Sequence, residues 1–250
     1  MKFKELSKND KIFRVINLIF MTLQALACLG LAIYYICIDD HDNRLMASFG
    51  MFIAVLLPFL YELAFRVRLS NIVFFFIQFY ALVAGVIGSV LNVYYLVSWY
   101  DIFVHTLAGY VFAVFGIFVL SRMENYSKLK KWTIVVFCFC FTMTCELIWE
   151  LFEWASDNLL GQTAQGLPPE GFDVPLVTDT MVDILCNFIG GIVFCTQYLL
   201  EKTLKCSFGI KLYERELVSQ ENVSTNELPV SDPLETENLP AEEIKQEGKE

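Results

Sequence analysis

Residues 102–121 read IFVHTLAGYVFAVFGIFVLS and contain no Asp, Glu, Lys or Arg. A helix of about 20 such residues crosses the apolar core of a bilayer, which is about 30 Å thick. Similar apolar stretches run at about residues 12–38, 45–65, 71–97, 132–155 and 179–200. The sequence therefore predicts an all-α, polytopic membrane protein with six transmembrane helices.

The composition is that of a chain whose main partner is the lipid bilayer. Apolar residues make up 56% of the sequence and the mean hydropathy is +0.52, whereas soluble domains hold roughly 45–50% apolar residues. The formal net charge is −10, but residues 207–250 contain four basic and eleven acidic residues and so contribute −7 of it. The membrane part is close to neutral, and we expect no nucleic-acid partner. The oligomeric state is left open.

The chain divides into two parts at about residue 205. Residues 1–205 form the predicted six-helix transmembrane domain, and residues 206–250 form an acidic, largely disordered cytoplasmic tail. From about residue 215 the tail is rich in Glu, Ser, Asn and Pro and poor in apolar residues, which is typical of disorder. Seven of the eight cysteines lie inside apolar stretches and the eighth, Cys206, follows the last one, so no disulfide framework is predicted.

The distribution of Lys and Arg predicts how the helices cross the membrane. With the N-terminus inside, 17 of the 18 basic residues lie on the cytoplasmic side, and only Arg44 lies outside. Basic loops are retained in the cytoplasm. We therefore expect a multi-pass protein of the cell membrane with both termini in the cytoplasm and a loop at about 156–178 on the outer face.

Polar side chains recur at helical spacing in three of the predicted spans. They are Asp101 and His105 in the fourth span, Glu146, Glu150, Glu153 and Asp157 in the fifth, and Asp179, Asp183 and Asn187 in the sixth. Spacings of three, four or seven residues place each set on one helix face. The fourth and sixth spans begin on the outer side and the fifth ends there, so all three sets lie toward the outer leaflet. We expect them to face one another around an outward-opening cavity.

Small residues lie just beneath these polar sets. Gly109, Gly190 and Gly191 would permit the helices to approach closely at that depth. Trp149 flanks the same region, either as an aromatic anchor at the membrane interface or as a substrate contact.

So many carboxylates need a source of positive charge, and no Lys or Arg lies near the outer side of these three spans. A bound cation, protons held by the carboxylates or a cationic ligand could supply it, and a polar packing core is the non-functional alternative. One imidazole with several carboxylates suits Zn²⁺, Mn²⁺ or Fe, and the other oxygen ligands suit Mg²⁺ or Ca²⁺. The candidate ligands of a divalent metal ion are Asp101, His105, Glu146, Glu150, Glu153, Asp179 and Asp183.

Short motifs in the same three spans resemble a known family. The matching pieces are Tyr100-Asp101 with His105 and Gly109, Glu146 with Trp149-Glu150 and Glu153, and Asp179-Thr180 with Asp183. They resemble the YjdF-type bacterial inner-membrane proteins, an uncharacterised family, while Asn187 and Gly190 resemble the more distant VanZ-like proteins. The resemblance implies a fold and a site more than a function. The link of VanZ-like proteins with glycopeptide resistance would point toward components of the cell envelope.

Three functions are compatible with such a site. The one we favour is a membrane-embedded, metal-dependent enzyme acting on a lipid or envelope precursor, with Glu150 or Glu153 as general base and His105 as a catalytic metal ligand. The alternatives are a cation or proton-coupled transporter and a non-catalytic membrane partner or ligand sensor. The sequence contains no GxSxG or HExxH signature, and the missing basic residues argue against tight phosphate recognition.

Overall fold

Long helices make up almost all of the structure, which is a computed structural model. It describes residues 8–39, 43–123, 126–160, 164–165, 176–204, 209–211, 213–214 and 217 of the 250-residue chain. The elements are α1 (Lys8–Cys37), α2 (Asn43–Phe65), α3 (Asn71–Tyr80), the π-helix η2 (Ala81–Val90), α4 (Val93–Leu96), α5 (Tyr100–Met123), the 3₁₀-helix η3 (Tyr126–Lys128), α6 (Lys131–Leu160) and α7 (Leu176–Leu204). The described residues form no β-strand, and six helical segments are long and apolar enough to span a membrane. The predicted all-α fold with six spans is confirmed.

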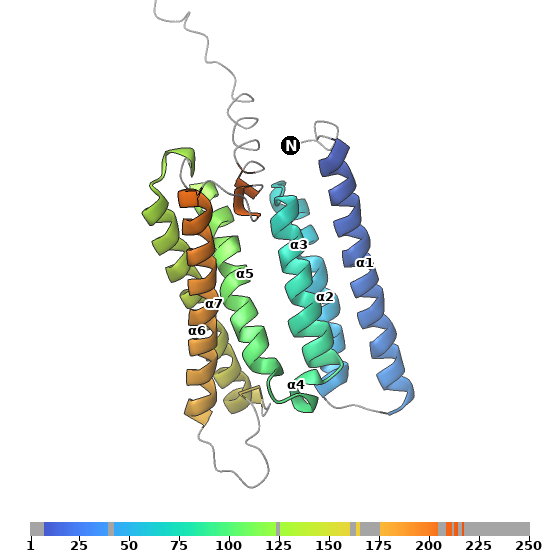
Figure 1. Cartoon of the computed structure of the whole chain (residues 1–250). Coiled ribbons are helices and arrows are strands. Elements are labelled where there is room, and N and C mark those ends of the chain that lie inside the picture. The colour runs from blue at the N-terminus through green and yellow to red at the C-terminus, as the bar shows by residue number, and fades with distance from the viewer. Residues whose placement is uncertain are drawn as a thin grey trace, which may run out of the picture.

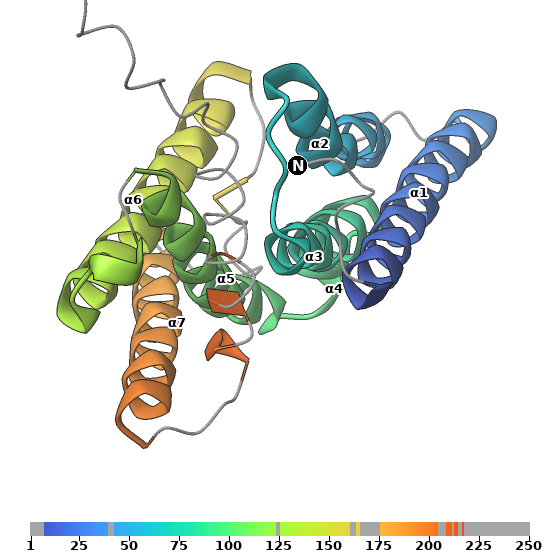
Figure 2. The same ribbon diagram turned by 90° about the horizontal axis from the view of Figure 1, so that it is seen from above.

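The six spans run side by side as two groups of three (Figure 1). Figure 2, which looks along the bundle, shows α1, α2 and α3 on one side and α5, α6 and α7 on the other. The start of α1 and the end of α7 lie at one end of the bundle, whereas α5 and α7 begin at the opposite end, which we name the far end. The side of the membrane that the far end faces stays a prediction from the basic residues.

The third span is shorter than the sequence predicts. The prediction is a helix over residues 71–97, but α3 gives way to the π-helix η2, and the span ends with η2. Asn92 then adopts a left-handed backbone conformation with φ 62°, which asparagine tolerates better than most residues. The chain turns back, and Tyr94 of α4 packs on η2 so closely that a Cβ atom on Gly88 would lie 2.4 Å from its ring.

The fifth and sixth spans extend farther toward the far end than the sequence predicts. Helix α6 continues to Leu160 and α7 begins at Leu176, so part of the predicted loop at 156–178 is helical. Hydropathy marks where a helix leaves the apolar core and not where the helix stops. Asp157 in the last turns of α6 accepts hydrogen bonds from the backbone N–H groups of Ala164 and Gln165 at 2.6 and 3.0 Å.

Polar contacts join the first three spans to one another. Arg14 of α1 and Glu62 of α2 form a part-buried ion pair. Gln24 of α1 donates a hydrogen bond to Gln78 of α3 at 3.3 Å. Helix α3 also packs against α5, so it connects the two groups of helices.

Helices α5 and α7 cross in direct backbone contact. A Cβ atom on Gly109 would lie 2.1 Å from the Asn187 carbonyl oxygen, and one on Gly190 would lie 2.0 Å from that of Thr106. Only glycine fits at either position without moving the helices, which confirms the predicted role of these small residues. The crossing fixes the register of the two helices, so residues one or two turns toward the far end, such as His105, come side by side with residues of α7.

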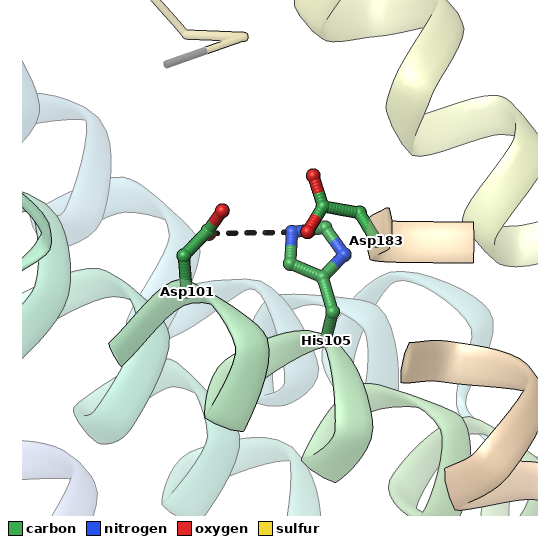
Figure 3. Close-up of side chains that lie close together, drawn as sticks. All are labelled: Asp101, His105 and Asp183. Atoms are coloured by element: carbon green, nitrogen blue, oxygen red, sulfur yellow. Dashed lines mark ion pairs between the residues drawn. The ribbon is translucent and has the colours of Figure 1, made fainter. Parts of the chain in front are cut away.

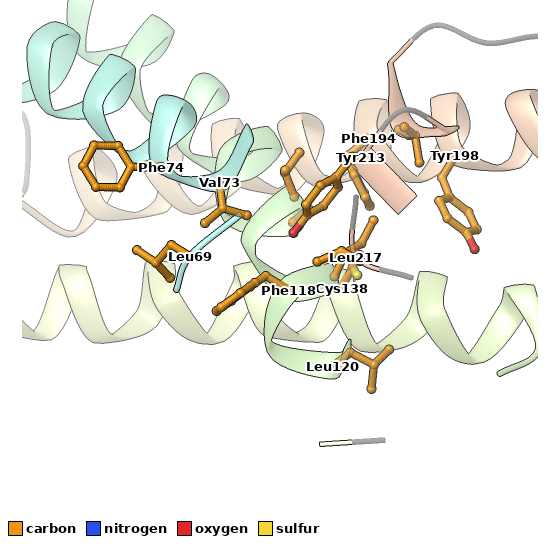
Figure 4. Packing of buried hydrophobic residues seen from close by; sticks show 14 of the residues in the cluster. Leu69, Val73, Phe74, Phe118, Leu120, Cys138, Phe194, Tyr198, Tyr213 and Leu217 are labelled. Carbon is orange, nitrogen blue, oxygen red and sulfur yellow. The ribbon is translucent and has the colours of Figure 1, made fainter. Parts of the chain in front are cut away.

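The main apolar core includes residues that follow α7 (Figure 4). Ile210, Tyr213 and Leu217 are buried in it. The buried carboxylate of Glu201 accepts hydrogen bonds from the backbone N–H groups of Ile210 and Lys211 at 3.2 and 3.1 Å, which fixes the start of this segment. The packed unit thus includes residues beyond the predicted boundary at 205. Residues 218–250, for which the sequence predicts disorder, lie outside the described residues.

Candidate functional site

His105 of α5 is the centre of a buried polar cluster at the far end of the bundle. Its Nδ1 atom lies 2.7 Å from Oε1 of Glu146 on α6. The other oxygen of Glu146 accepts a hydrogen bond from the Asn187 side chain of α7 at 2.8 Å. The Thr142 hydroxyl, one turn deeper on α6, lies 3.3 Å from the side-chain oxygen of Asn187. The inner part of the cluster is therefore a hydrogen-bonded network that joins three helices.

The opposite edge of the His105 ring faces two aspartates. Nε2 lies 3.5 Å from Oδ1 of Asp101, one turn earlier on α5, and Asp183 of α7 points toward the same ring (Figure 3). One possible ligand atom from each of the three residues lies within 4.8 Å of the other two. Asp183 is buried, whereas the side chain of Asp101 is 37% exposed, so the cluster is open to its surroundings on the Asp101 side.

The two ring nitrogens of His105 thus have different environments. In a neutral imidazole one nitrogen carries a proton and donates, and the other is free to accept a proton or bind a metal. An ionised Glu146 only accepts, so its contact favours the proton on Nδ1 and leaves the lone pair of Nε2 toward the aspartates. A carboxylate that holds one nitrogen of a metal-binding histidine is a recurring arrangement. One imidazole and two carboxylates fit a divalent cation.

A second trio of groups, formed by His105, Glu146 and Glu150, is also close enough for an ion. It would use Nδ1 of His105, which Glu146 already engages and which lies 4.0 Å from Glu150. Glu150 is only 4% exposed, and both of its carboxylate oxygens are buried. Its carboxylate has the Thr180 hydroxyl of α7 as a hydrogen-bond partner and lies within electrostatic range of Asp179. A charge in such surroundings is costly unless a positive group compensates it.

Two predicted ligands stand outside both trios. Glu153, one turn beyond Glu150, is buried and accepts a hydrogen bond from the indole N–H of Trp149 at 2.8 Å. Its carboxylate lies within electrostatic range of His105. Asp179, in the first turn of α7, is half-buried at the edge of the cluster. Both carboxylates lie within electrostatic range of His105.

Two tyrosines also lie within electrostatic range of the cluster, and the sequence gives no signal for either. Tyr80, at the junction of α3 and η2, lies within electrostatic range of three site carboxylates, including Glu146 and Asp101. Tyr94 lies within range of Asp101 as well. In the sequence Tyr80 is one of many aromatic residues in an apolar stretch. Tyr94 falls in a predicted helix, and only the break at Asn92 brings it back toward the site.

Sequence comparison places the chain in a family of membrane proteins. The family described as "Predicted membrane protein (DUF2238)" matches residues 19–202 of the chain. The chain belongs to the DUF2238 family. The match extends from α1 into α7 and includes every residue of the cluster. No curated protein and no solved structure matches the chain. Membership of DUF2238 confirms the predicted resemblance to an uncharacterised membrane family, while the YjdF-type and VanZ-like likeness stays a prediction.

Proposed function

We propose that this DUF2238 protein is a membrane-embedded enzyme that uses a divalent metal ion, held by Asp101, His105 and Asp183, to act on a lipid or envelope precursor. The observation that carries the proposal is the division of the His105 ring, with Nδ1 held by Glu146 and Nε2 facing two aspartates. Three protein ligands leave a position for water or substrate, as at catalytic zinc sites. Zn²⁺, Mn²⁺ or Fe²⁺ at this position would activate water or polarise a substrate oxygen.

The remaining carboxylates differ in what they can do. Glu146 is hydrogen-bonded through both oxygens, so it orients His105 and is not available to a substrate. Glu153 is held through one oxygen by Trp149 and lies nearer the far end. A carboxylate oriented in this way can accept a proton from water or from a substrate, and Glu153 is the general base in this proposal.

The position of the cluster favours a lipid-like substrate. The outward faces of α6 and α7 beside it expose large apolar side chains, among them Leu147, Leu151, Met181 and Leu185. In a membrane such faces contact lipid, so a substrate with acyl chains can approach from the bilayer. The distribution of basic residues predicts that this end lies outside the cytoplasm. The YjdF-type and VanZ-like resemblance also supports an envelope substrate, as an analogy between families.

A transport function receives less support from the packing beneath the cluster. Toward the other end of the bundle, the interior between α5, α6 and α7 contains fully buried apolar side chains, among them Ile117, Cys138 and Phe194. Such packing favours a site that is closed on its inner side.

Metal analysis of the purified protein tests the proposed ligands. After exposure to Zn²⁺ or Mn²⁺ and removal of loose ions, the wild type should retain metal by mass spectrometry. Asp183→Asn should not, because it removes a charged ligand while nearly preserving shape. Asp157→Asn is the matched control, since that carboxylate binds backbone N–H groups outside both trios of possible ligands. Equal metal content in wild type and Asp183→Asn would overturn the metal site.

Product formation tests the enzymatic part of the proposal. Lipid and envelope-precursor extracts would be incubated with metal-loaded protein and compared by mass spectrometry. We expect products that form with the wild type and are absent with Glu153→Gln. The same products at the same rate from both proteins would contradict the role of Glu153 as the base.

A further inference from the structure

Asn187 of α7 is a buried polar residue that is not among the proposed metal ligands. It is fully buried, as is Thr142 of α6, and Glu146 is 1% exposed. The Asn187 amide donates a hydrogen bond to Oε2 of Glu146 at 2.8 Å, and its side-chain oxygen lies 3.3 Å from the Thr142 hydroxyl. Because these groups are closed off from solvent, they depend on one another for hydrogen bonds.

The spacing on α6 explains why an asparagine fits at this position. Thr142 and Glu146 are four residues apart, so they lie on one face of the helix and about 6 Å apart along its axis. A single side-chain amide meets both, since it presents an oxygen on one edge and N–H donors on the other. An aspartate would place two acceptors there, and a leucine of similar size would offer no polar atom.

The backbone of Asn187 is held at the crossing of α5 and α7. A Cβ atom on Gly109 would lie 2.1 Å from the Asn187 carbonyl oxygen, so the two helices leave no room between them at this point. The Thr142 hydroxyl also lies 3.0 Å from the Gly109 carbonyl oxygen, which joins α6 to the same crossing. The packing of the three helices therefore sets the direction in which the Asn187 amide points.

We infer that Asn187 is a positioning residue of the proposed metal site, because it holds Glu146 so that His105 keeps a proton on Nδ1 and presents Nε2 to the metal. A glutamate side chain has several rotatable bonds, and a contact through one oxygen leaves the carboxylate able to turn. Asn187 binds Oε2, so Oε1 stays 2.7 Å from Nδ1 of His105. This inference rests on the proposed function, since it names a residue that prepares the same site.

Nuclear magnetic resonance of His105 tests the inference without a metal. The chain contains two histidines, so isotope-labelled histidine in a His41→Gln background reports His105 alone. We expect this background protein to show a proton on Nδ1 that exchanges slowly with water, because Glu146 accepts it in a buried hydrogen bond. Asn187→Leu should make the exchange faster, because Glu146 is then able to turn away from the ring. A background protein without a proton on Nδ1, or an Asn187→Leu protein with unchanged exchange, would overturn the inference.

Variants of Thr142 separate positioning from an effect on folding. Thr142→Val removes the hydroxyl that meets Asn187 and nearly preserves shape, so the Nδ1 proton should exchange faster, whereas Thr142→Ser should keep the exchange slow. Thr144→Val is the matched control on the same helix, because the exposed Thr144 hydroxyl donates to the Cys140 carbonyl oxygen at 2.8 Å. If Asn187→Leu does not fold, equal exchange in the Val and Ser variants of Thr142 contradicts the inference.

Zinc titration of the same proteins extends the test to the proposed site. Asn187→Leu should weaken Zn²⁺ binding about tenfold, the lower end of the loss for residues that support a metal-binding histidine. Added to Glu146→Gln, it should cost little more, since both changes act through one contact. Wild-type Zn²⁺ affinity in a variant with fast exchange contradicts the positioning role and leaves the metal site standing. Slow exchange in a background protein that binds no metal contradicts only the metal site.

Discussion

Replacing Gly190 by alanine should separate α5 from α7 and disturb the cluster without changing any polar residue. The added Cβ atom would lie 2.0 Å from the carbonyl oxygen of Thr106 and 3.0 Å from the Cα atom of Gly109. Both neighbours are backbone atoms, so no side chain can rotate away. The helices must move apart by roughly 1 Å or more, and overpacking of this kind costs about 1–3 kcal/mol.

Thermal unfolding of the purified protein measures this cost. For a chain of this size, about 1–3 kcal/mol corresponds to a melting temperature lower by roughly 2–12 °C. Metal content should fall as well, because His105 and Asp183 lie on the two helices that separate. Gly30→Ala in α1 is the matched control, since a Cβ atom there meets nothing within 4 Å. Alanine favours a helix over glycine by about 1 kcal/mol, so this variant should melt at the wild-type temperature or above. A Gly190→Ala protein that behaves like the control would refute the reasoning.

Three further results are expected. Glu146→Gln should weaken metal binding about 10- to 100-fold because it alters the group that orients the metal-binding histidine; an unchanged affinity in metal titration would contradict that role. Cysteines placed at Ser98 and Lys130, in a background without accessible native cysteines, should be labelled from outside intact cells only at Ser98; labelling only at Lys130 would reverse the topology. A chain cut after residue 217 should melt like the full chain, while one cut after residue 208 should melt lower, because it loses buried apolar side chains worth about 1.5–3 kcal/mol each. Equal melting temperatures for the two truncations would argue against the packing of Ile210, Tyr213 and Leu217 in the apolar core.

The grouping of polar residues at the far end could be predicted because helical spacing and chain direction act together. Four-residue spacing places Asp101 and His105 on one face of α5, whatever α5 packs against. The alternating direction of the spans then sets the depth of Glu150 and Asp183 to match. Both rules hold for any straight helix that crosses a membrane, so no knowledge of tertiary contacts was needed.

The contacts within the cluster could not be predicted from the sequence. Whether His105 meets Glu146 or Glu150 depends on side-chain rotamers and on a shift of less than one turn along α6. The end of the third span depends on Asn92, because the apolar stretch continues past it and hydropathy does not distinguish an α-helix from a π-helix. The approach of Tyr94 to Asp101 follows from that turn, so the sequence does not predict it either.

Two of the three buried glutamates of α6, Glu146 and Glu150, differ in how they are held. Glu146 uses both oxygens to bind side chains of α5 and α7, so its burial holds three helices together. Glu150, one turn away, is also buried, but it is held by fewer hydrogen bonds, with the Thr180 hydroxyl of α7 as partner and the His105 ring at 4.0 Å. A helix does not need a carboxylate there, since an apolar residue of similar size would be neutral or stabilising at such a position. A charged Glu150 at this depth is costly unless a positive group compensates it, which is what a metal ion bound at the proposed site would do.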